Sequence, residues 1–467
     1  MDDTPRPPES RETVPTREAD LEGGPGTVER IGGSDSHTTG RREGTDDPDR
    51  ILVLDAHKNA SLVFGRALEG QNVEITSGGW SRMSPGMLSR HATDRFLYSS
   101  PYRKPERFVA ELTGFLRAND YFAVVPMSDL THVLLSKHKT KLEQTGTAVG
   151  VEDWETFVTA NDKRSLARLL EDLGVPGPHT HAPESTDDVD ASKDEFTYPV
   201  LIKPRFTTVL TDDGTYTEAR ISEKNYVHSP DQLVRRYGSL VETYDYFQRE
   251  PPIVQEVLSG AVTATCGLAA DGEFVDYFQE ERLRMYPVDG GSSSLRQGIH
   301  EPEMAEHARK IVAALEWTGP IYIEFIGSDD GTFTVLEVNG RYWGSVGCAI
   351  CGGVNVPLLH YQQLKGAQLT PKPGYETGRK QRRLFYTDLR WLNAQLEAGN
   401  YRAVDPFVRS FFDSDHDVLA ADDPLPTLGA ILWAIRETVR SEGPVQTPKE
   451  PDRSPASRST DRFGGEN

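Results

Sequence analysis

The sequence has few cysteines, no long apolar run and a deficit of positive charge. Its three cysteines, Cys266, Cys348 and Cys351, are too few and too unevenly placed for a disulfide framework, which favours a reducing compartment. No window approaches the roughly 18 consecutive apolar residues of a membrane span. The first thirty residues also lack the apolar segment of a signal peptide. We therefore predict a soluble, cytoplasmic protein that does not cross a membrane.

The charge balance narrows the choice of partners. With 72 acidic and 51 basic side chains the formal net charge is −21, which disfavours binding to nucleic-acid phosphates or to an anionic membrane surface. The 14 lysines are far outnumbered by 37 arginines. An acidic, lysine-poor surface suits solution at very high salt, where like-charge repulsion is screened, so we predict a halophilic host. An ordinary acidic cytosolic protein remains the alternative.

The length and the local composition predict several domains. A chain of 467 residues is too long for one hydrophobic core. Residues 1–49 and 442–467 are rich in Pro, Gly and charged residues and poor in large apolar ones, so both are predicted to be disordered tails. Between them we expect a Rossmann-like domain over 50–150, a two-lobed domain over 151–368 and a helical appendage over 369–441.

The first ordered domain shows the alternation of a parallel sheet. Strands are expected at residues 50–55, 73–76 and 122–126, with a helical pattern between the first two. No GxGxxG follows the first strand, so the domain lacks the phosphate-binding turn of dinucleotide enzymes. Asp55 and Asp129 come just after strands, where open α/β sheets place ligands, although N-capping of helices explains them equally well.

The second domain reads as α+β. An amphipathic helix over 162–170 ends at Gly174-Val175-Pro176, and strands are expected over 198–204 and 252–260. A run of antiparallel strands follows at 261–268, 273–279, 321–326 and 332–339, with a helix over 304–315 whose apolar residues recur at helical spacing. Cys348 and Cys351 are expected to pack in a buried helix rather than bind metal. Further helices are expected at 384–396 and 426–441.

One predicted hairpin carries the chemistry. Glu337 and Asn339 alternate along a strand and so point to one face, and Glu324 lies on the preceding strand. A register that pairs Phe325 with Thr334 puts Glu324 one diagonal step from Glu337. Two carboxylates and an amide oxygen then converge, which is the set of hard ligands that Mg²⁺ takes beside substrate phosphates. Solvated polar residues at a strand end are the alternative, which the neighbouring Arg341 disfavours.

These residues resemble the ATP-grasp superfamily of carboxylate–amine or carboxylate–thiol ligases, typified by the large subunit of carbamoyl phosphate synthase. The resemblance spans about residues 50–370 and is strongest over Leu336-Glu337-Val338-Asn339-Gly340-Arg341-Tyr342-Trp343-Gly344-Ser345. It implies a two-lobed ATP-grasp fold, with a lid lobe over about 185–258 and a metal-binding lobe over about 259–368, and it implies ATP and Mg²⁺ or Mn²⁺ as cofactors.

The resemblance also assigns roles to residues. Lys163 and Lys203 match the lysines that contact the nucleotide, and Arg341 matches the arginine near the transferred phosphate. The residues implied at the adenine hinge are Gln255, Glu256, Val257 and Leu258, and those implied as metal ligands are Glu324, Glu337 and Asn339. Two family features are missing: the segment 205–214 supplies one glycine where a Gly-rich lid loop is usual, and no acidic residue follows the hinge to meet the ribose.

A second stretch, residues 279–296, resembles the substrate-side loop of one branch of the family. Arg282, Arg284 and Arg296 bracket a Gly-Gly-Ser turn whose N–H groups can receive an anion. We predict that Arg296 first, and Arg284 with it, bind the carboxylate substrate or its acyl phosphate. A solvated arginine-bearing loop is the alternative.

The sequence thus predicts an ATP-dependent carboxylate–amine ligase acting on small molecules. Phosphoryl transfer to another acceptor and ATP binding without chemistry remain as alternatives. The identity of the carboxylate and the nucleophile is not encoded in any motif, and a homodimer is the general expectation for the assembly.

Overall fold

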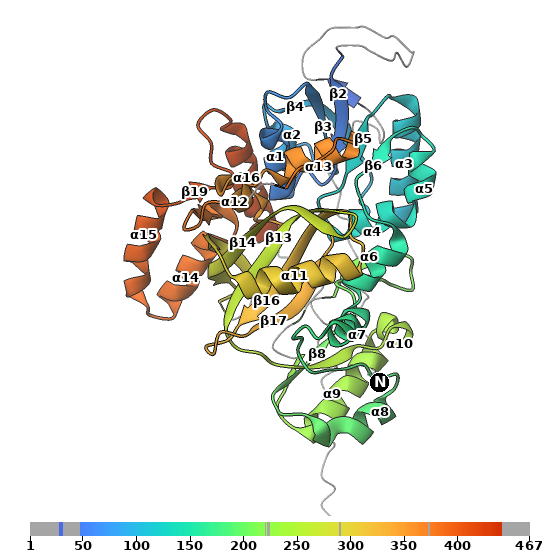
Figure 1. The fold of residues 1–467 in the computed structure, drawn as a ribbon, viewed down its shortest axis with the longest axis vertical. Coiled ribbons are helices and arrows are strands. Elements are labelled where there is room, and N and C mark those ends of the chain that lie inside the picture. The colour runs from blue at the N-terminus through green and yellow to red at the C-terminus, as the bar shows by residue number, and fades with distance from the viewer. Residues whose placement is uncertain are drawn as a thin grey trace, which may run out of the picture.

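The computed structural model of the protein describes residues 28–30, 47–219, 221, 225–288, 291–371 and 374–440 (Figure 1). The tail predicted over 442–467 lies outside the described residues, as does most of the tail over 1–49. Strand β1 (Val28–Arg30) lies within the latter and pairs antiparallel with β4 (Ala92–Leu97). For these three residues the prediction of disorder is wrong. A sheet edge supplies ladder hydrogen bonds to a short segment that has no core of its own.

The N-terminal domain is built on a six-stranded sheet of order β1-β4-β3-β2-β5-β6, parallel except at β1. The remaining strands are β2 (Asp49–Val53), β3 (Val73–Gly79), β5 (Ala123–Val125) and β6 (Ala148–Val149). The helices are α1 (Asn59–Ala67), α2 (Pro85–Leu88), α3 (Pro105–Ala118), α4 (Asp129–Lys137) and α5 (Lys139–Glu143). The three strands expected from the sequence are confirmed.

The sheet reverses its strand order between β2 and β5, because β3 and β5 pair with β2 on opposite sides. The side chains of Ile51, Leu52 and Val53 are all fully buried, because helices cover both faces of the sheet. Asp55 and Asp129 follow β2 and β5 and therefore lie together at this reversal, the place where open α/β sheets bind ligands.

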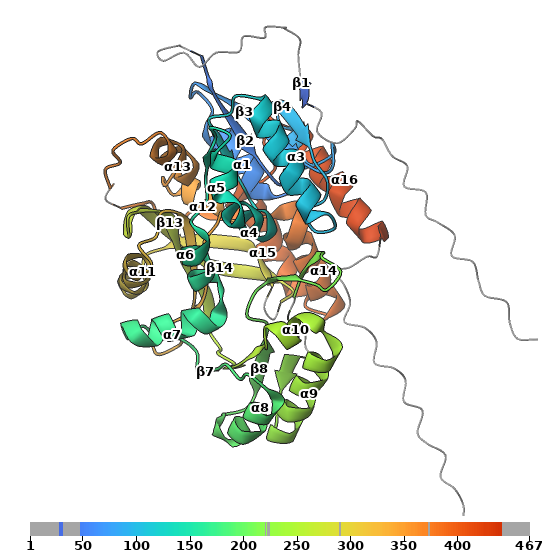
Figure 2. The same ribbon diagram turned by 90° about the vertical axis from the view of Figure 1, so that its right-hand side faces the viewer.

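Two helices, α6 (Trp154–Asn161) and α7 (Lys163–Leu173), lead to a small lobe at the lower end of Figure 1. Its sheet has the order β11-β8-β12-β7. The elements of this lobe are β7 (Thr180–His181), α8 (Thr186–Ser192), η1 (Lys193–Glu195), β8 (Val200–Lys203), β11 (Tyr226–Val227), α9 (Pro230–Thr243), α10 (Asp245–Arg249) and β12 (Ile253–Glu256). A separate hairpin, β9 (Thr208–Leu210) with β10 (Tyr216–Glu218), follows β8. Figure 2 shows this lobe apart from the rest of the molecule, below α7.

The central lobe is a seven-stranded sheet of order β17-β16-β13-β14-β15-β18-β19. Its strands are β13 (Ala261–Ala270), β14 (Glu273–Tyr286), β15 (Ser292–Ile299), β16 (Gly319–Gly327), β17 (Phe333–Asn339), β18 (Lys380–Arg382) and β19 (Asp415–His416). Helix α11 (Pro302–Ala314) covers one face, and α12 (Val346–Cys351) and α13 (Val356–Leu364) pack against the other.

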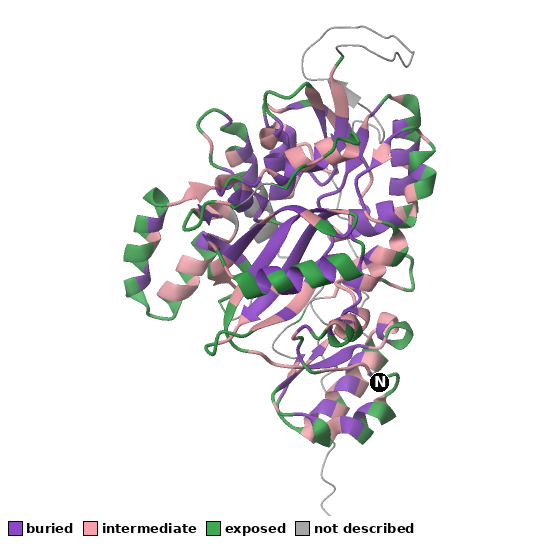
Figure 3. Ribbon diagram, in the orientation of Figure 1, coloured by how far each residue is buried: buried purple, intermediate pink, exposed green. Residues whose placement is uncertain are grey.

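Helix α11 confirms the helix expected over 304–315. Met304, Ala308, Ile311 and Val312 are fully buried against the sheet, and Figure 3 shows the opposite side of the helix exposed to solvent. Burying each large side chain of this kind stabilises the fold by about 1.5–3 kcal/mol. Helix α12 likewise confirms the buried small-residue helix, since Cys348 is buried and all three cysteines are free thiols.

Residues 279–286 and 292–296 do not form a loop. They belong to strands β14 and β15, which pair with irregular register on both sides of Arg284, and the Arg282 position pairs directly with Arg296. The alternating pattern of this hairpin was obscured in the sequence by its charged residues. Arg296 therefore stands inside a strand rather than directly after a turn.

The C-terminal segment extends the central lobe and also contacts the N-terminal domain. After β18 come η3 (Leu384–Asp388), α14 (Leu389–Glu397), η4 (Tyr401–Ala403), α15 (Val404–Phe412), β19 and α16 (Leu425–Arg440). Asp423 accepts hydrogen bonds from Ser89 Oγ at 2.7 Å and from Arg66 Nη2 at 3.1 Å. Both predicted helices are confirmed, whereas α15 was not expected. Within the described residues, no helix is both long and apolar enough to span a membrane.

Candidate active site

The carboxylates predicted on the hairpin lie opposite each other. Glu324 on β16 pairs directly with Glu337 on β17, and Tyr322 pairs with Asn339. Directly paired residues of an antiparallel ladder point to the same face, with Cβ atoms about 4.5–5.5 Å apart. The expectation that Glu324, Glu337 and Asn339 share one face is confirmed.

The register that led to this expectation is wrong. Phe325 pairs with Val335 rather than with Thr334, and a β-bulge follows, because Leu336 is an extra residue on β17. Because of the bulge, the two glutamates lie directly opposite each other. They are therefore closer than they would be at the diagonal position that we expected. A one-residue bulge leaves no trace in the pattern of apolar residues, so the sequence could not reveal it.

The two lysines converge on this hairpin from different elements. Lys163 is the first residue of α7, and its Nζ lies 3.5 Å from Glu337 Oε1 and 3.5 Å from the carbonyl oxygen of Arg205. Lys203 ends β8, and its Nζ lies 3.4 Å from Gln255 Oε1. Asp162, the N-cap of α7, holds Arg205 by a bidentate ion pair and so ties the start of α7 to the end of β8.

The local charges shift the titration of these groups. Burial and the neighbouring Lys163 hold the pKa of Lys203 below its ordinary value. Burial raises the pKa of Glu337, but the charges of Lys163 and Lys203 outweigh it and keep the pKa below the usual range. Glu337 is therefore ionised at neutral pH. The ammonium groups of Lys163 and Lys203 lie near it, where they could bind phosphate oxygens.

The hinge residues lie along β12 and just beyond it. Gln255 Nε2 donates to Thr180 Oγ1 at 2.9 Å, and Glu256 Oε1 accepts from the His179 backbone N–H at 2.6 Å. Val257 and Leu258 follow the strand and are half-buried. The strand leads from the small lobe to the central lobe, and the Glu256 side chain is held by the β7 segment. Of the four predicted residues, only Gln255 lines either of the two cavities described next.

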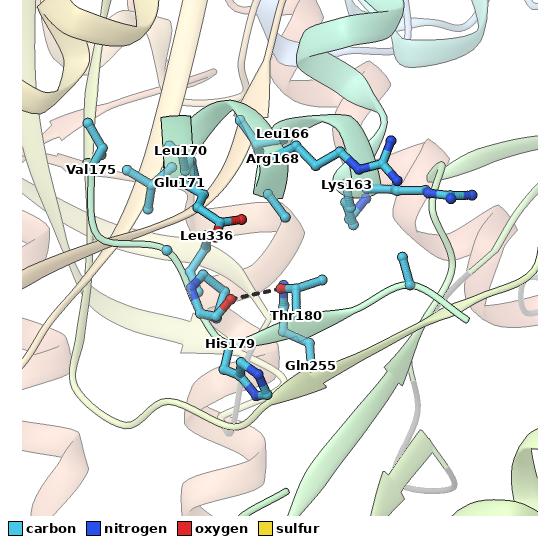
Figure 4. Close-up of a pocket in the computed structure, with 16 residues that line it drawn as sticks. Lys163, Leu166, Arg168, Leu170, Glu171, Val175, His179, Thr180, Gln255 and Leu336 are labelled. Carbon is cyan, nitrogen blue, oxygen red and sulfur yellow. Dashed lines mark hydrogen bonds between the residues drawn. The ribbon is translucent and has the colours of Figure 1, made fainter. Parts of the chain in front are cut away.

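Two cavities meet at the lysine–glutamate pair. The first, of about 560 Å³, lies between α7 and the strands β7 and β12 (Figure 4). In that view Leu166 and Leu170 extend from α7, while His179, Thr180 and Gln255 lie on the opposite side. Leucine side chains, among them Leu336, line part of this cavity, and Lys163 lines one end of it. The wall of the cavity is therefore partly apolar, with a cationic group at one end.

The second cavity, of about 280 Å³, lies over the face of the hairpin that carries the glutamates. It is lined by Thr207, Arg282, Ser292, Ser293, Arg296, Tyr322, Glu324, Glu337, Asn339, Arg341, Trp343, Gly344, Ser345 and Arg383. Lys163 of the first cavity contacts Glu337 of the second, so the two cavities adjoin at this ion pair, and together they are called the cleft below. Four arginines and two glutamates make its inner end strongly polar.

Arg341 is fixed on three sides. Its Nε donates to Asp129 Oδ1, its Nη1 donates to the carbonyl oxygen of Tyr342 at 2.8 Å, and its Nη2 donates to Asn339 Oδ1 at 3.3 Å. Asp129 comes from α4 of the N-terminal domain, 212 residues away in the chain. Asp129 does not cap its helix, because Ser128 occupies that position and accepts from the Thr131 N–H.

The predicted substrate arginines have different environments. Arg282 donates to Glu324 Oε2 and, at 3.2 Å, to the hydroxyl of Tyr322, so it faces the cavity. Arg296 also lines the cavity but is 1% exposed, and its Nη2 lies 2.5 Å from Asp417 Oδ1 of the C-terminal segment.

Arg284 is turned away from the cleft. Its guanidinium donates to Ser410 Oγ at 2.9 Å and to the carbonyl oxygen of Pro406 at 2.7 Å, and it stacks over the ring of Trp391. The expectation that Arg284 binds the substrate is therefore corrected. The irregular register at Leu283 rotates Arg284 away from the face that Arg282 occupies.

Sequence reasoning missed several residues of the cleft. Arg282 was noted beside the turn but not selected, and Asp129 was noted at a strand end without its partner Arg341. Arg383 of the cavity, and Asp417, which binds Arg296, carry no recognisable signal, because only the pairing of β18 and β19 onto the sheet edge brings them there. Glu280 lies behind the cavity, where Ser345 Oγ donates to it and burial raises its pKa.

The hairpin fits a divalent metal. Glu324 and Glu337 each use one oxygen in the ion pairs with Arg282 and Lys163, and their other oxygens, Glu324 Oε1 and Glu337 Oε2, accept no hydrogen bond from the described residues. With Asn339 Oδ1 they form a set of oxygen donors suited to Mg²⁺ or Mn²⁺.

The comparisons with known proteins begin with sequence. No protein-family model matches the chain. It is 25% identical over 293 residues to the multifunctional protein URA2 of Saccharomyces cerevisiae, and 24% identical over 215 residues to the carbamoyl phosphate synthase large chain of Acidobacterium capsulatum. These matches cover 59% and 43% of this chain but 12% and 18% of those proteins, so the chain spans less than a fifth of their length.

Solved structures extend the comparison. A biotin carboxylase–β,γ-ATP complex from Campylobacter jejuni matches with a TM-score of 0.56 at 12% identity, over 72% of this chain and 75% of that one. N5-carboxyaminoimidazole synthetase from Staphylococcus aureus matches with a TM-score of 0.52 at 13% identity, over 71% of this chain and 80% of that one. At these identities the likeness shows the fold alone. The chain therefore has a mixed α/β fold similar to the folds of biotin carboxylase and N5-carboxyaminoimidazole synthetase.

Proposed function

We propose that the protein is an ATP-dependent ligase that activates a carboxylate as an acyl phosphate and condenses it with an amine or a similar nucleophile. One observation carries the proposal: Glu324, Glu337, Asn339 and Arg341 line a single cavity that meets a second cavity at Lys163. The sequence relatives and fold neighbours support it, because carbamoyl phosphate synthase and biotin carboxylase are ATP-dependent ligases.

In this proposal ATP lies along the cleft. The adenine contacts the hinge residues Gln255, Glu256, Val257 and Leu258, of which Gln255 lines the first cavity and the other three follow it in the chain. The phosphates then reach the junction, where Lys163 and Lys203 supply positive charge in a water-poor setting. The hairpin β9–β10 follows β8 at the position of a lid, and Thr207 before it lines the second cavity.

The metal ligands of the proposal are Glu324, Glu337 and Asn339. A bound Mg²⁺ or Mn²⁺ would be held by these residues and would neutralise phosphate charge there. A solved neighbour, the biotin carboxylase domain of the Hydrogenobacter thermophilus 2-oxoglutarate carboxylase, contains MgADP and bicarbonate. It matches with a TM-score of 0.54 at 13% identity over 71% of this chain and 73% of that one.

The proposed reaction has two displacements. A carboxylate oxygen attacks the γ-phosphorus of ATP, the bond to the β–γ bridging oxygen breaks, and ADP leaves. The nitrogen of the second substrate then attacks the acyl carbon, phosphate leaves, and the nitrogen loses a proton to solvent. Arg341, with Arg282 and Arg296 nearby, stabilises the negative charge of the phosphoryl group and the acyl phosphate. Arg284 has no part in this scheme.

We also propose the setting of the enzyme. It acts in the cytoplasm on small molecules, its acidic, lysine-poor composition is an adaptation to a salt-rich host, and it assembles as a homodimer.

The test is product formation. The protein is incubated with Mg²⁺, ATP and a metabolite extract, and condensed products are identified by mass spectrometry. ADP and phosphate released in equal amounts only when a carboxylate and an amine are both present support a ligase. A phosphorylated product without condensation identifies a kinase instead. If no mixture consumes ATP, the remaining alternative is a protein that binds ATP without chemistry.

A Glu337→Gln variant tests the metal assignment. The exchange keeps the shape but removes the charge, so Mg·ATP turnover is expected to fall at least 10²-fold while the melting temperature stays within a few degrees. Asp329→Asn, an exposed change in the turn of the same hairpin, is the matched control. Wild-type turnover in Glu337→Gln would show that the metal is held elsewhere.

A further inference from the structure

Asp129 lies where the N-terminal domain meets the active-site hairpin. It is the first residue of α4 at the reversal of the strand order, and its carboxylate accepts from Arg341 Nε. The sequence left open whether Asp129 serves a ligand or caps a helix. Ser128 provides the cap, so the carboxylate of Asp129 is not needed for capping and instead binds Arg341 of the central lobe.

Hydrogen bonds to Asp55 hold the loop that carries Asp129. Asp55 is fully buried, and its Oδ2 accepts from the Met127 N–H at 3.0 Å and from Thr131 Oγ1 at 2.5 Å. These two contacts flank Asp129 in the chain and fix the turn between β5 and α4. Asp129 is therefore a rigid anchor rather than a mobile surface carboxylate.

Asp129 sets the orientation of the Arg341 guanidinium. A guanidinium has five N–H groups, and three of them are engaged by Asp129, Tyr342 and Asn339. The other two, one on each Nη, have no hydrogen-bond partner in the described part of the chain, and Arg341 lines the cavity above the glutamates. A pair of N–H groups aimed into a cavity matches the oxygen atoms of a phosphoryl group.

Arg341 has a competing acid in the same cavity. Its ion pair with Asp129 is largely shielded from solvent, since the two side chains are 22% and 23% exposed. Arg341 also lines the cavity that contains Glu337. Without Asp129 the guanidinium is free to turn within this cavity toward Glu337, where it would neutralise a proposed metal ligand.

We propose that Asp129 is a positioning residue: it aims the two free N–H groups of Arg341 at the γ-phosphoryl group of ATP and keeps Arg341 from pairing with Glu337. This inference rests on the proposed function. It also gives the N-terminal domain a role in phosphoryl transfer, because a carboxylate of that domain completes the geometry of a hairpin in another lobe.

The first measurement is steady-state turnover of Mg·ATP with bicarbonate and a panel of small carboxylates. In Asp129→Asn, which keeps an acceptor but loses the charge, kcat is expected to fall about 10-fold, and in Asp129→Ala about 100-fold. Asp153→Asn is the matched control, because Asp153 also lies at a helix N-terminus and pairs with Lys139 but is 69% exposed. It is expected to leave kcat unchanged.

The second measurement does not need turnover. Binding of ADP and of β,γ-imido-ATP is compared by calorimetry with Mg²⁺ present. The Arg341 guanidinium favours the nucleotide with a γ-phosphate. The dissociation constant for ADP divided by that for β,γ-imido-ATP is therefore expected to fall at least fivefold in Asp129→Ala. That result upholds the positioning role even if wild type turns over no substrate and the proposed function fails.

Two results overturn the inference. One is a wild-type protein that turns over ATP while Asp129→Ala keeps both its kcat and its binding ratio. The other is a parallel loss of kcat, of affinity for both nucleotides and of melting temperature in Asp129→Ala, which would mean that the pair merely holds the two domains together.

Discussion

Gly340 separates the proposed metal ligand Asn339 from Arg341, and the structure leaves no room for a side chain there. A Cβ atom on Gly340 would lie 2.1 Å from Cη2 of Trp317, an indole that is 1% exposed. The close packing of strand and indole fixes the end of β17. The two functional side chains on either side of Gly340 are therefore held by the core beneath them.

We predict that Gly340→Ala lowers the free energy of unfolding by about 1–3 kcal/mol, the usual effect of overpacking a core. Mg·ATP turnover is expected to fall as well, because Asn339 and Arg341 move with the strand. Chemical denaturation and turnover assays measure the two effects. Gly114→Ala is the control: Gly114 is exposed in α3 with no atom within 4 Å of its added Cβ, so this change is expected to stabilise by about 0.5–1 kcal/mol.

At this scale the sequence was most informative where residue type and spacing are specific. The alternation of Glu337 and Asn339 placed both on one face, and their resemblance to a known family added Lys163 and Lys203, which lie at the same cleft. Arg284 was misjudged because a single irregular step in the ladder reverses the direction of a side chain. Asp129 could not be paired with Arg341, since no local pattern links residues of two domains.

Two elements, α7 and β8, are joined by one buried ion pair. Asp162 is 2% exposed and holds Arg205 Nη2 at 2.5 Å, while the backbone N–H of Lys163 donates to the Arg205 carbonyl oxygen at 3.2 Å. Burial raises the pKa of Asp162, but the hydrogen bond and charge of Arg205 outweigh it and keep the pKa below the usual value.

This pair makes part of the stability depend on pH. Because the pKa of Asp162 is lower in the folded chain than in the unfolded chain, its stabilisation is complete above the unfolded value of about 3.9 and is lost as pH falls through the folded value. We predict that wild type is more stable than Asp162→Asn at pH 7 and that the gap closes in acid. Melting temperatures from pH 7 to pH 3 measure it; a gap that stays constant would contradict the pair's role.

The C-terminal segment is tied to β15 by a second buried pair. Arg296 and Asp417 are 1% and 3% exposed, and Arg296 also donates to Gln381 Oε1 at 2.8 Å. Removing one member leaves a buried charge without its partner, so Asp417→Leu is expected to destabilise by about 3–5 kcal/mol.

The double variant Arg296→Met with Asp417→Leu separates stability from function. It is expected to recover most of the lost stability, because no unpaired charge remains. If Arg296 serves the substrate, turnover stays low although the fold is restored. Denaturation curves and turnover of the single and double variants are compared, and a double variant no more stable than Asp417→Leu would contradict the argument.

For the whole molecule, individual strands could be predicted where a short apolar run is bounded by polar turns. Residues 50–55 of the first sheet and residues 321–326 of the central lobe are such runs, and a strand forms at each. The joining of β18 and β19 to the central sheet could not be foreseen. These strands have three and two residues, too short for any periodicity, and tertiary pairing alone defines them.

The net charge of −21 gives a prediction for the entire chain. Repulsion among surface carboxylates opposes folding, and raising NaCl from about 0.1 M to about 1 M shortens the screening length from about 10 Å to about 3 Å. The melting temperature is therefore expected to rise over this range. A non-ionic osmolyte at equal osmolality is the control, since it does not screen charge. A melting temperature that falls with salt would contradict a dominant role of repulsion.

Strand β17 is the outermost strand of the seven-stranded sheet, so its free edge borders the cleft. An open edge of this kind also invites a strand from another molecule. Here the extra residue Leu336 interrupts the edge, and the Val335 N–H already donates to the Pro176 carbonyl oxygen at 2.9 Å. The irregularity that sets the two glutamates face to face therefore also hinders aggregation through this edge of the sheet.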